Sequence, residues 1–281
     1  MTALNLSDNF IDTILPLTTL TALQCLTLSF NAITKLPNEL SVLSNLHTLR
    51  IDHNQIRKIR ASIAALTALT SLNIAHNKLR EIDPTFAALT QLVECDISYN
   101  RIKELPPQMT DMAALTSFNA SHNHIRHLPL LPPACTFCVT NNYLQSFKFD
   151  PATHTDLRLA NNLLKTLPPL AGTKVSRVFV PFNQLTTLPD LGTQVLALNV
   201  SFNKLTNLTE LIAPCTNLRQ LSISFCRITR IPNKFLNNFP NLQIFEAGFN
   251  PIEYIVFQPL PKLQTFSMPN CNLKQFPENL F

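Results

Sequence analysis

The sequence predicts an α/β solenoid, in which short coils stack and their strands form one parallel β-sheet. Three observations predict it. One pattern of apolar residues recurs along the whole chain, its central part alternates with the period of a β-strand, and the segments between strands have room for at most a short helical turn. One coil cannot bury its apolar side alone, but stacked coils share a continuous core.

The repeat is anchored by an asparagine. Leu49 and Ile51 precede Asn54 by five and three residues, and Ile56 and Ile59 follow it by two and five. The pattern L-x-x-L-x-L-x-x-N-x-L-x-x-L recurs at thirteen anchors: Asn9, Asn31, Asn54, Asn77, Asn100, Asn123, Asn142, Asn162, Asn183, Asn203, Cys226, Asn250 and Cys271. Apolar residues fill the columns two and five after the anchor in every repeat, so the array is expected to cover the chain.

The alternation predicts which side chains face the core. Leu49 and Ile51 are expected on one face of a strand, and Arg50 and Asp52 on the other. Proline often follows an apolar column residue, which suits the convex side, where no sheet hydrogen bonds are required.

The anchor asparagine is expected at an inward turn, where its amide can bond backbone groups that would otherwise be buried unpaired. Successive anchors should therefore form a ladder through the solenoid. Cys226 and Cys271 replace asparagine with a weaker hydrogen-bonding group, so these two turns should be less well satisfied.

The pattern resembles the leucine-rich-repeat family over the whole chain. The resemblance implies a right-handed, horseshoe-shaped solenoid with a parallel β-sheet on the concave face and short helical or extended segments on the convex face. The longer repeats resemble those of intracellular scaffolds of the Ras-suppressor type. The shorter central repeats resemble those of bacterial effector proteins.

Anchor spacing divides the predicted single solenoid, residues 1–281, into three blocks. Long repeats fill 1–129, where backs such as 61–69 can hold a helical turn. Short repeats fill 130–210, where the back should be extended, and longer repeats return in 211–281.

Neither end of the array shows a polar capping segment. Met1 already lies in the first apolar column, and Phe281 lies inside the thirteenth repeat. Because terminal repeats normally need a polar outer face, two interpretations stay open. The array is one module of a larger protein, or its open ends associate with another subunit.

Composition limits the class of protein. Hydrophobic residues make up 46% of the chain and charged residues 14%, which excludes a disordered chain. Polar positions interrupt every apolar run well before the roughly 20 residues of a membrane-spanning helix, so no span is expected. The net charge of +5 includes no block of Lys or Arg, and nucleic acid is not an expected ligand.

Cysteine usage bears on the compartment. Seven cysteines are scattered along the chain instead of gathering at its ends as disulfide-bonded caps would. The N-terminal segment also lacks the basic and unbroken apolar parts of a secretory signal. Both features favour a reducing compartment, so a cytoplasmic location is expected.

The candidate binding surface is the concave face, read from the positions six, four, two and one before each anchor. Its polar side chains would stand in register over several coils. In repeats three to six the candidates are Arg50, Asp52, His53, Asn73, His76, Glu94, Asp96, Tyr99, Asn119 and His122.

A second candidate patch comprises Arg158, Arg177, Phe179 and Phe182. Phenylalanine then continues the column directly before the anchor in three further repeats. That column is either an exposed stripe for a partner or an aromatic ladder that stacks on itself and is partly buried. Phe179 belongs to a column that should point outward.

No enzyme site is expected. The chain lacks the G-x-S-x-G, P-loop and H-E-x-x-H motifs, and its three glycines cannot make a phosphate loop. Cys135 and Cys138 have C-x-x-C spacing, but they fall in a predicted strand and no second pair completes a zinc site. His122 and His127 lie in different parts of the repeat, so no metal or other cofactor is expected.

These features predict a non-enzymatic interaction module that binds a protein partner on its concave face. The family resemblance implies an intracellular partner such as a small GTPase or a phosphatase subunit. Two alternatives stay open: the targeting region of a larger signalling phosphatase or kinase, and a secreted effector.

Overall fold

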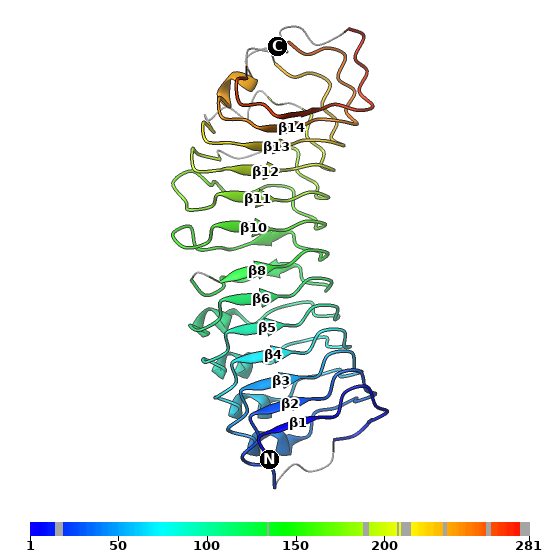
Figure 1. Cartoon of the computed structure of the whole chain (residues 1–281), viewed down its shortest axis with the longest axis vertical. Helices are drawn as coiled ribbons and strands as arrows, with labels where there is room; N and C mark the ends of the chain where they lie inside the picture. Colours follow the sequence, from blue (N-terminus) through cyan, green and yellow to red (C-terminus); the bar gives the residue numbers. More distant parts are fainter. Residues whose placement is uncertain are drawn as a thin grey trace. The chain divides into compact units, whose positions relative to one another are not determined.

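The computed structural model describes residues 1–14, 19–133, 135–187, 191–206, 208, 215–232, 235–256 and 260–275. The chain divides into two compact units, Met1–Asp150 and Pro151–Phe281, and each is described by itself. Within each unit the strands of the main sheet lie parallel and succeed one another along the chain (Figure 1).

The first unit contains a seven-stranded parallel sheet in the order β1-β2-β3-β4-β5-β6-β8. Leu26, Leu49 and Leu72 are register partners in neighbouring strands, so equivalent residues of successive repeats form straight columns. A small parallel pair, β7 with β9, lies outside this sheet. The strands are β1 (Ala3–Asn5), β2 (Cys25–Thr27), β3 (Thr48–Arg50), β4 (Ser71–Asn73), β5 (Glu94–Asp96), β6 (Ser117–Asn119), β7 (His127–Leu128), β8 (Thr136–Cys138) and β9 (Ser146–Phe147).

The second unit contains a six-stranded parallel sheet in the order β10-β11-β12-β13-β14-β15. Val178, Leu198 and Leu221 are register partners there, as leucines are in the first unit. The strands are β10 (Asp156–Arg158), β11 (Arg177–Phe179), β12 (Ala197–Asn199), β13 (Gln220–Ser222), β14 (Ile244–Glu246) and β15 (Thr265–Ser267).

The apolar columns form the core of each unit. Leu49 and Ile51 are fully buried, and Arg50 between them is exposed, which confirms the predicted alternation. Burying one such side chain stabilises the fold by about 1.5–3 kcal/mol, so an unbroken column supplies much of the stability of each coil. None of the helices in the described ranges has the length and apolar character needed to cross a membrane.

Short 3-10 helices form the backs of the long repeats. The back predicted over 61–69 to hold a helical turn contains η2. Leu66, the residue directly after this helix, donates its N–H to Ile63 O at 3.0 Å. Through the described part of 130–210 the backs contain no helix, but turns at 151–153, 171–172 and 193–194 interrupt the extended course that was expected. The helices are η1 (Asn38–Val42), η2 (Ala61–Ala65), η3 (Pro84–Ala88), η4 (Pro107–Asp111) and η5 (Leu236–Asn238).

The anchor asparagines form the predicted ladder. Asn77 Nδ2 donates to Ile51 O, Ile74 O and Ala75 O at 3.0, 3.2 and 3.1 Å, and its Oδ1 accepts from Ile56 N at 2.9 Å. Each amide thus joins two neighbouring coils. The same set of four bonds occurs at Asn31, Asn54, Asn100, Asn123, Asn142, Asn183, Asn203 and Asn250.

The two cysteine anchors make weaker contacts, as predicted. Cys226 Sγ lies 3.5 Å from Val200 O and 3.6 Å from Ser224 O, and one S–H hydrogen serves both. Cys271 Sγ lies 3.5 Å from Ala247 O. Burial raises the pKa of the Cys226 thiol, so the sulfur stays protonated and donates only weakly.

Candidate functional site

The sheet of the first unit carries a groove on the face turned away from the core. Four successive strands, β3 to β6, supply its walls from the positions six and four before the anchor. We call it the strand groove, and its outward-facing residues are Thr48, Arg50, Ser71, Asn73, Glu94, Asp96, Ser117 and Asn119. Register pairing places Arg50, Asn73, Asp96 and Asn119 in one row. The structure thus brings five of the predicted residues together on one surface.

Charge is unevenly distributed along the strand groove. Arg50 lies on β3 and is exposed, whereas Glu94 and Asp96 lie two strands away on β5. Asp96 is held in place, because its Oδ1 accepts from Ser98 N at 2.9 Å and its Oδ2 accepts from Asn119 Nδ2 at 3.2 Å. A ligand in the groove would meet a cation at one side and two carboxylates at the other.

Asp52 is not part of this surface, so the prediction that it faces outward is wrong. Its side chain is only 7% exposed, and Asp52 Oδ1 accepts a hydrogen bond from Ser29 Oγ at 2.6 Å. The reason is the length of the strands. β3 ends at Arg50, so the alternation stops there and the chain turns inward, which also buries Ala75 and Ser98 at the equivalent position.

The column directly before the anchor forms an aromatic stack in each unit. In the first unit, adjacent rings lie 4.0–4.1 Å apart between centroids and nearly parallel. We call this the His/Tyr ladder, and it comprises Phe30, His53, His76, Tyr99 and His122. His122 Nε2 also lies 3.0 Å from Asn141 Nδ2, which continues the contact to the next coil.

The second unit has a matching stack, which we call the Phe ladder. Its rings lie 3.9–4.0 Å apart between centroids and are 36–50% exposed. The two interpretations of this column are therefore compatible, since the rings stack on one another and keep their edges in solvent. The Phe ladder comprises Phe182, Phe202, Phe225 and Phe249.

Every residue in this column has a left-handed backbone, with φ between 51° and 56°. Sequence reasoning missed this, because bulky residues such as Tyr and Phe rarely adopt positive φ. The available signal was Asn141, Asn161 and Asn270 in the same column, since asparagine tolerates that conformation. The strained backbone turns each ring along the array and makes the stacking possible.

His76 has a perturbed titration within the His/Tyr ladder. The pKa of His76 is lowered from its usual 6.5, first by burial of the ring and then by the charge of neighbouring His53, while Asp96 and Asp52 pull it upward. The unfolded chain therefore takes up a proton at His76 more readily than the folded chain. Stability that is present above pH 6.5 is lost as the pH falls below that value.

We expect acid to destabilise the parent chain more than the variant His76→Phe, which keeps the ring and removes the titration. The measurement is the urea midpoint of unfolding at about pH 7.5 and about pH 5.5, on either side of the usual histidine pKa. His47→Phe, at an exposed histidine outside the ladder, is the matched control. Equal pH dependence in the parent chain and both variants would contradict the expectation.

The second candidate patch lies on the sheet of the second unit. Arg177 Nε is 2.6 Å from Asp156 Oδ1, and Arg158 is 3.8 Å from the other carboxylate oxygen. The hydrogen bond and charge of Asp156 raise the pKa of Arg177. Phe179 is half-buried between the fully buried Val178 and Val180, so it lies on the outward face as expected. The sequence did not indicate Asp156, because its position between Arg158 and Arg177 becomes visible only when the coils stack.

The residues considered for metal or redox chemistry do not converge. His127 Nδ1 lies 2.9 Å from Ser146 Oγ, away from the Asn141 contact of His122. Cys138 belongs to β8 as predicted, whereas Cys135 lies just before the strand, and burial raises the pKa of Cys135 to about 12. All seven cysteines lie within the described ranges, and none of them is in a disulfide. Across those ranges, His, Cys, Asp and Glu form no group of three suited to a metal ion.

Comparison with known proteins agrees with this architecture. The family described as Leucine rich repeat matches residues 21–79, 44–94 and 67–125, and a second description, Leucine Rich Repeat, matches 217–239. No curated protein matches the chain.

Solved structures share the fold at low sequence identity. A leucine-rich-repeat protein of Leptospira interrogans is similar over 92% of this chain and 70% of its own, with 23% identity and a TM-score of 0.74. The effector YopM of Yersinia pestis is similar over 92% of this chain and 74% of its own, with 24% identity and a TM-score of 0.67. Drosophila Toll, in the Toll–Spatzle complex, is similar over 92% of this chain and 42% of its own, with 23% identity and a TM-score of 0.73.

The family matches cover repeats in both units, and the solved relatives reproduce the stacked parallel strands. The asparagine ladder explains in physical terms why the anchor recurs. The chain is a leucine-rich-repeat protein.

Proposed function

We propose that this chain is a non-enzymatic interaction module that binds a protein partner on its concave face. Leucine-rich-repeat proteins are generally interaction modules. The observation that carries the proposal is the strand groove, in which side chains from four strands stand in register beside one another. An in-register row of donors, acceptors and charges suits recognition of an extended protein surface.

Rigidity of the strand groove supports the proposal. Asp96 is fixed by Ser98 and Asn119, and Asn73 Oδ1 accepts from Ala75 N at 3.0 Å. Side chains that are already ordered lose less conformational entropy when a partner docks. Among the structural relatives, Toll was solved in complex with the protein Spatzle.

Charge defines the partner that would fit. Its surface would carry basic groups opposite Glu94 and Asp96 and an acidic group opposite Arg50. A small GTPase or a phosphatase subunit in the cytoplasm is the partner class to test first. Arg158, Arg177, Phe179 and Phe182 are proposed as a second contact region in the other unit.

Seven cysteines that form no disulfide support the proposed cytoplasmic location, because a reducing compartment disfavours disulfide bonds. The likeness to YopM, together with the short repeats of 130–210, favours a secreted effector as the second candidate function. Cell fractionation with an antibody against the chain separates the two: recovery in the cytosol supports the scaffold, and recovery in the culture medium supports the effector.

Reversing charge in the strand groove is expected to weaken partner binding about tenfold or more, because close charge pairs at interfaces contribute more than about 1.4 kcal/mol. The variant is Glu94→Lys with Asp96→Lys. The partner is first isolated with the unmodified chain from cell lysate, and its affinity for each variant is then measured by calorimetry.

Glu104→Lys with Asp111→Lys is the matched control, since it makes the same charge change at exposed positions outside the groove. Glu94→Lys alone is the second groove variant, because changing Asp96 could also disturb folding. Glu94 is exposed, whereas Asp96 accepts hydrogen bonds from Ser98 and Asn119. Unchanged affinity in both groove variants would rule out the strand groove as the contact surface.

A further inference from the structure

Positive charge gathers on the turn side of the first unit, outside the strand groove. The segments that follow five successive anchors, 32–36, 55–60, 78–83, 101–106 and 124–129, contain nine Lys or Arg and three Asp or Glu. Their excess of positive charge is larger than the net +5 of the whole chain. The remainder of the protein is therefore close to neutral, and this side dominates its long-range field.

The cations fall in two columns, one and three residues after the anchor. Between them, Ile56, Leu79 and Ile102 are fully buried, so the flanking residues point to solvent. These two columns carry six cations and no carboxylate in four successive coils. We call them the basic strip: Arg57, Lys78, Arg80, Arg101, Lys103 and Arg126.

Stacking brings these residues close together. Lys78 N donates to Ile56 O at 2.9 Å, and Arg101 N donates to Leu79 O at 2.8 Å, so successive coils are joined through their backbones. The cations therefore recur at the strand spacing of about 4.8 Å, although they are far apart in the sequence.

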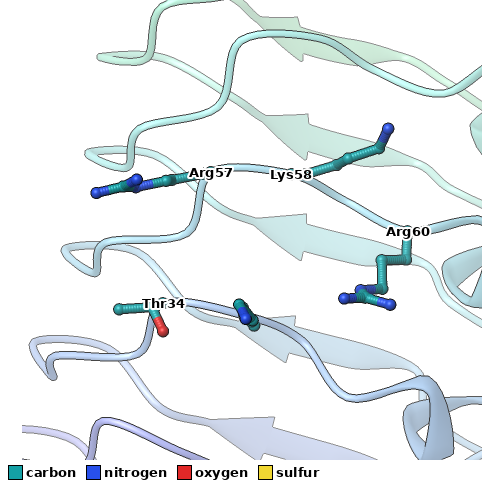
Figure 2. Close-up of a pocket in the computed structure, with 5 residues that line it drawn as sticks. Thr34, Arg57, Lys58 and Arg60 are labelled. Carbon is teal, nitrogen blue, oxygen red and sulfur yellow. The ribbon is translucent and has the colours of Figure 1, made fainter.

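Two shallow hollows lie along the basic strip. One is lined by Arg57, Lys78, Arg80 and Arg101. The other is lined by Thr34, Lys35, Arg57, Lys58 and Arg60, so the two share Arg57. Figure 2 shows Arg57 and Lys58 extending in opposite directions from one segment, while Arg60 turns back toward the coil that carries Thr34.

Most of these cations are not neutralised by the protein itself. Lys58 pairs with Glu81 at 2.7 Å, and Lys78 Nζ donates to Gln55 Oε1 at 3.1 Å. Within the described part of the chain, the side chains of Arg57, Arg80 and Arg101 form neither an ion pair nor a hydrogen bond. A row of guanidinium groups that have no partner within the described residues is suited to binding carboxylates or phosphates, because each group can donate two parallel hydrogen bonds to such an anion.

The residues beside the basic strip determine which kind of polyanion can bind there. On one side Glu81, Asp83 and Glu104 flank it, so the purely cationic surface is only two columns wide. A flat lipid surface or a duplex would meet these carboxylates as well.

On the other side lies the His/Tyr ladder. The inner rings His53, His76 and Tyr99 are covered on both faces by neighbouring rings at 4.0–4.1 Å, so only their edges are free and bases have no platform there on which to stack. A single extended acidic strand avoids both obstacles. In such a strand alternate carboxylates lie about 6.6 Å apart, within reach of long side chains on coils about 4.8 Å apart.

We propose that the basic strip binds an extended acidic segment of a protein, with Asp or Glu carboxylates seated between Arg57, Lys78, Arg80 and Arg101. This surface is distinct from the strand groove. A partner with a folded domain and an acidic tail could occupy both surfaces at once.

The test uses the full chain and a fluorescently labelled peptide of alternating Glu and Ser, with binding followed by anisotropy. Arg57→Glu with Arg80→Glu is expected to weaken binding about tenfold or more, and added salt should weaken it further. Arg57→Gln with Arg80→Gln is the milder second variant. Lys204→Glu with Arg227→Glu, at exposed cations of the second unit, makes the same charge change and should stay within about twofold of the parent.

Several outcomes would overturn the proposal. One is that the acidic peptide does not bind, and another is that the control pair loses as much peptide affinity as the arginine variants. A third is that single-stranded RNA or phosphatidylserine vesicles bind more tightly than the peptide, and that the arginine variants abolish this binding. A peptide with Gln in place of Glu should not bind. Glu94→Lys should leave peptide binding intact, so failure here is distinguishable from failure of the strand groove.

Discussion

Replacing Asn77 with alanine is expected to lower the free energy of unfolding by about 3 kcal/mol, because it removes the two amide hydrogens that three carbonyls share and leaves one buried N–H without an acceptor. The orphan is Ile56 N–H, whose partner is Asn77 Oδ1 at 2.9 Å. Ile51 O and Ile74 O keep one donor each, from Asn54 and Asn100, because neighbouring anchors share these carbonyls. Because the carbonyls are shared, the loss of stability is smaller than a count of hydrogen bonds suggests. The shared carbonyls also couple adjacent coils.

The measurement is urea unfolding followed by far-UV circular dichroism, with hydrogen exchange of β3 to β5 to locate the effect. Gln55→Ala, at an exposed position in the neighbouring coil, is the control and should change stability by less than about 0.5 kcal/mol. The converse change, Cys226→Asn, should raise stability by about 1 kcal/mol, because an amide replaces weak sulfur contacts. A destabilised Cys226→Asn variant would contradict the account of the ladder.

Local patterns were sufficient to predict the fold. The period-two alternation alone predicts that Leu49 and Ile51 lie in the core, because burial in a strand depends on a residue's immediate neighbours. The asparagine ladder was predicted for a similar reason, since a buried turn requires a side chain that both donates and accepts.

The surface was harder to predict, because it depends on where strands end and on which coils meet. Extending the alternation beyond Arg50 predicts that Asp52 faces outward, but the three-residue strand stops at Arg50 and Asp52 is buried. The basic strip was missed for the opposite reason. Arg57 and Arg80 are 23 residues apart and form no charge block in the sequence, yet they line one hollow when their coils stack.

The rings of the Phe ladder both stack on one another and remain partly exposed. The variant Phe202→Ala should show whether the stacking stabilises the fold. Phe202 stacks on Phe182 at 3.9 Å and on Phe225 at 4.0 Å between ring centroids. Each aromatic pair contributes about 0.5–1.5 kcal/mol beyond area burial, so loss of both should cost roughly 2 kcal/mol. Alanine removes the stacking but keeps the cost of a left-handed backbone, with φ of 56°.

Phe202→Asn separates these two contributions, because asparagine tolerates positive φ and already fills this column at Asn161 and Asn270. We expect it to be less destabilising than Phe202→Ala in thermal and urea unfolding. Leu196→Ala, at a similarly exposed apolar side chain outside the ladder, is the control and should cost less than about 0.5 kcal/mol. If Phe202→Ala costs no more than this control, the rings add nothing to stability. Their half-exposed edges would then be free to contact a partner without a role in the stability of the fold.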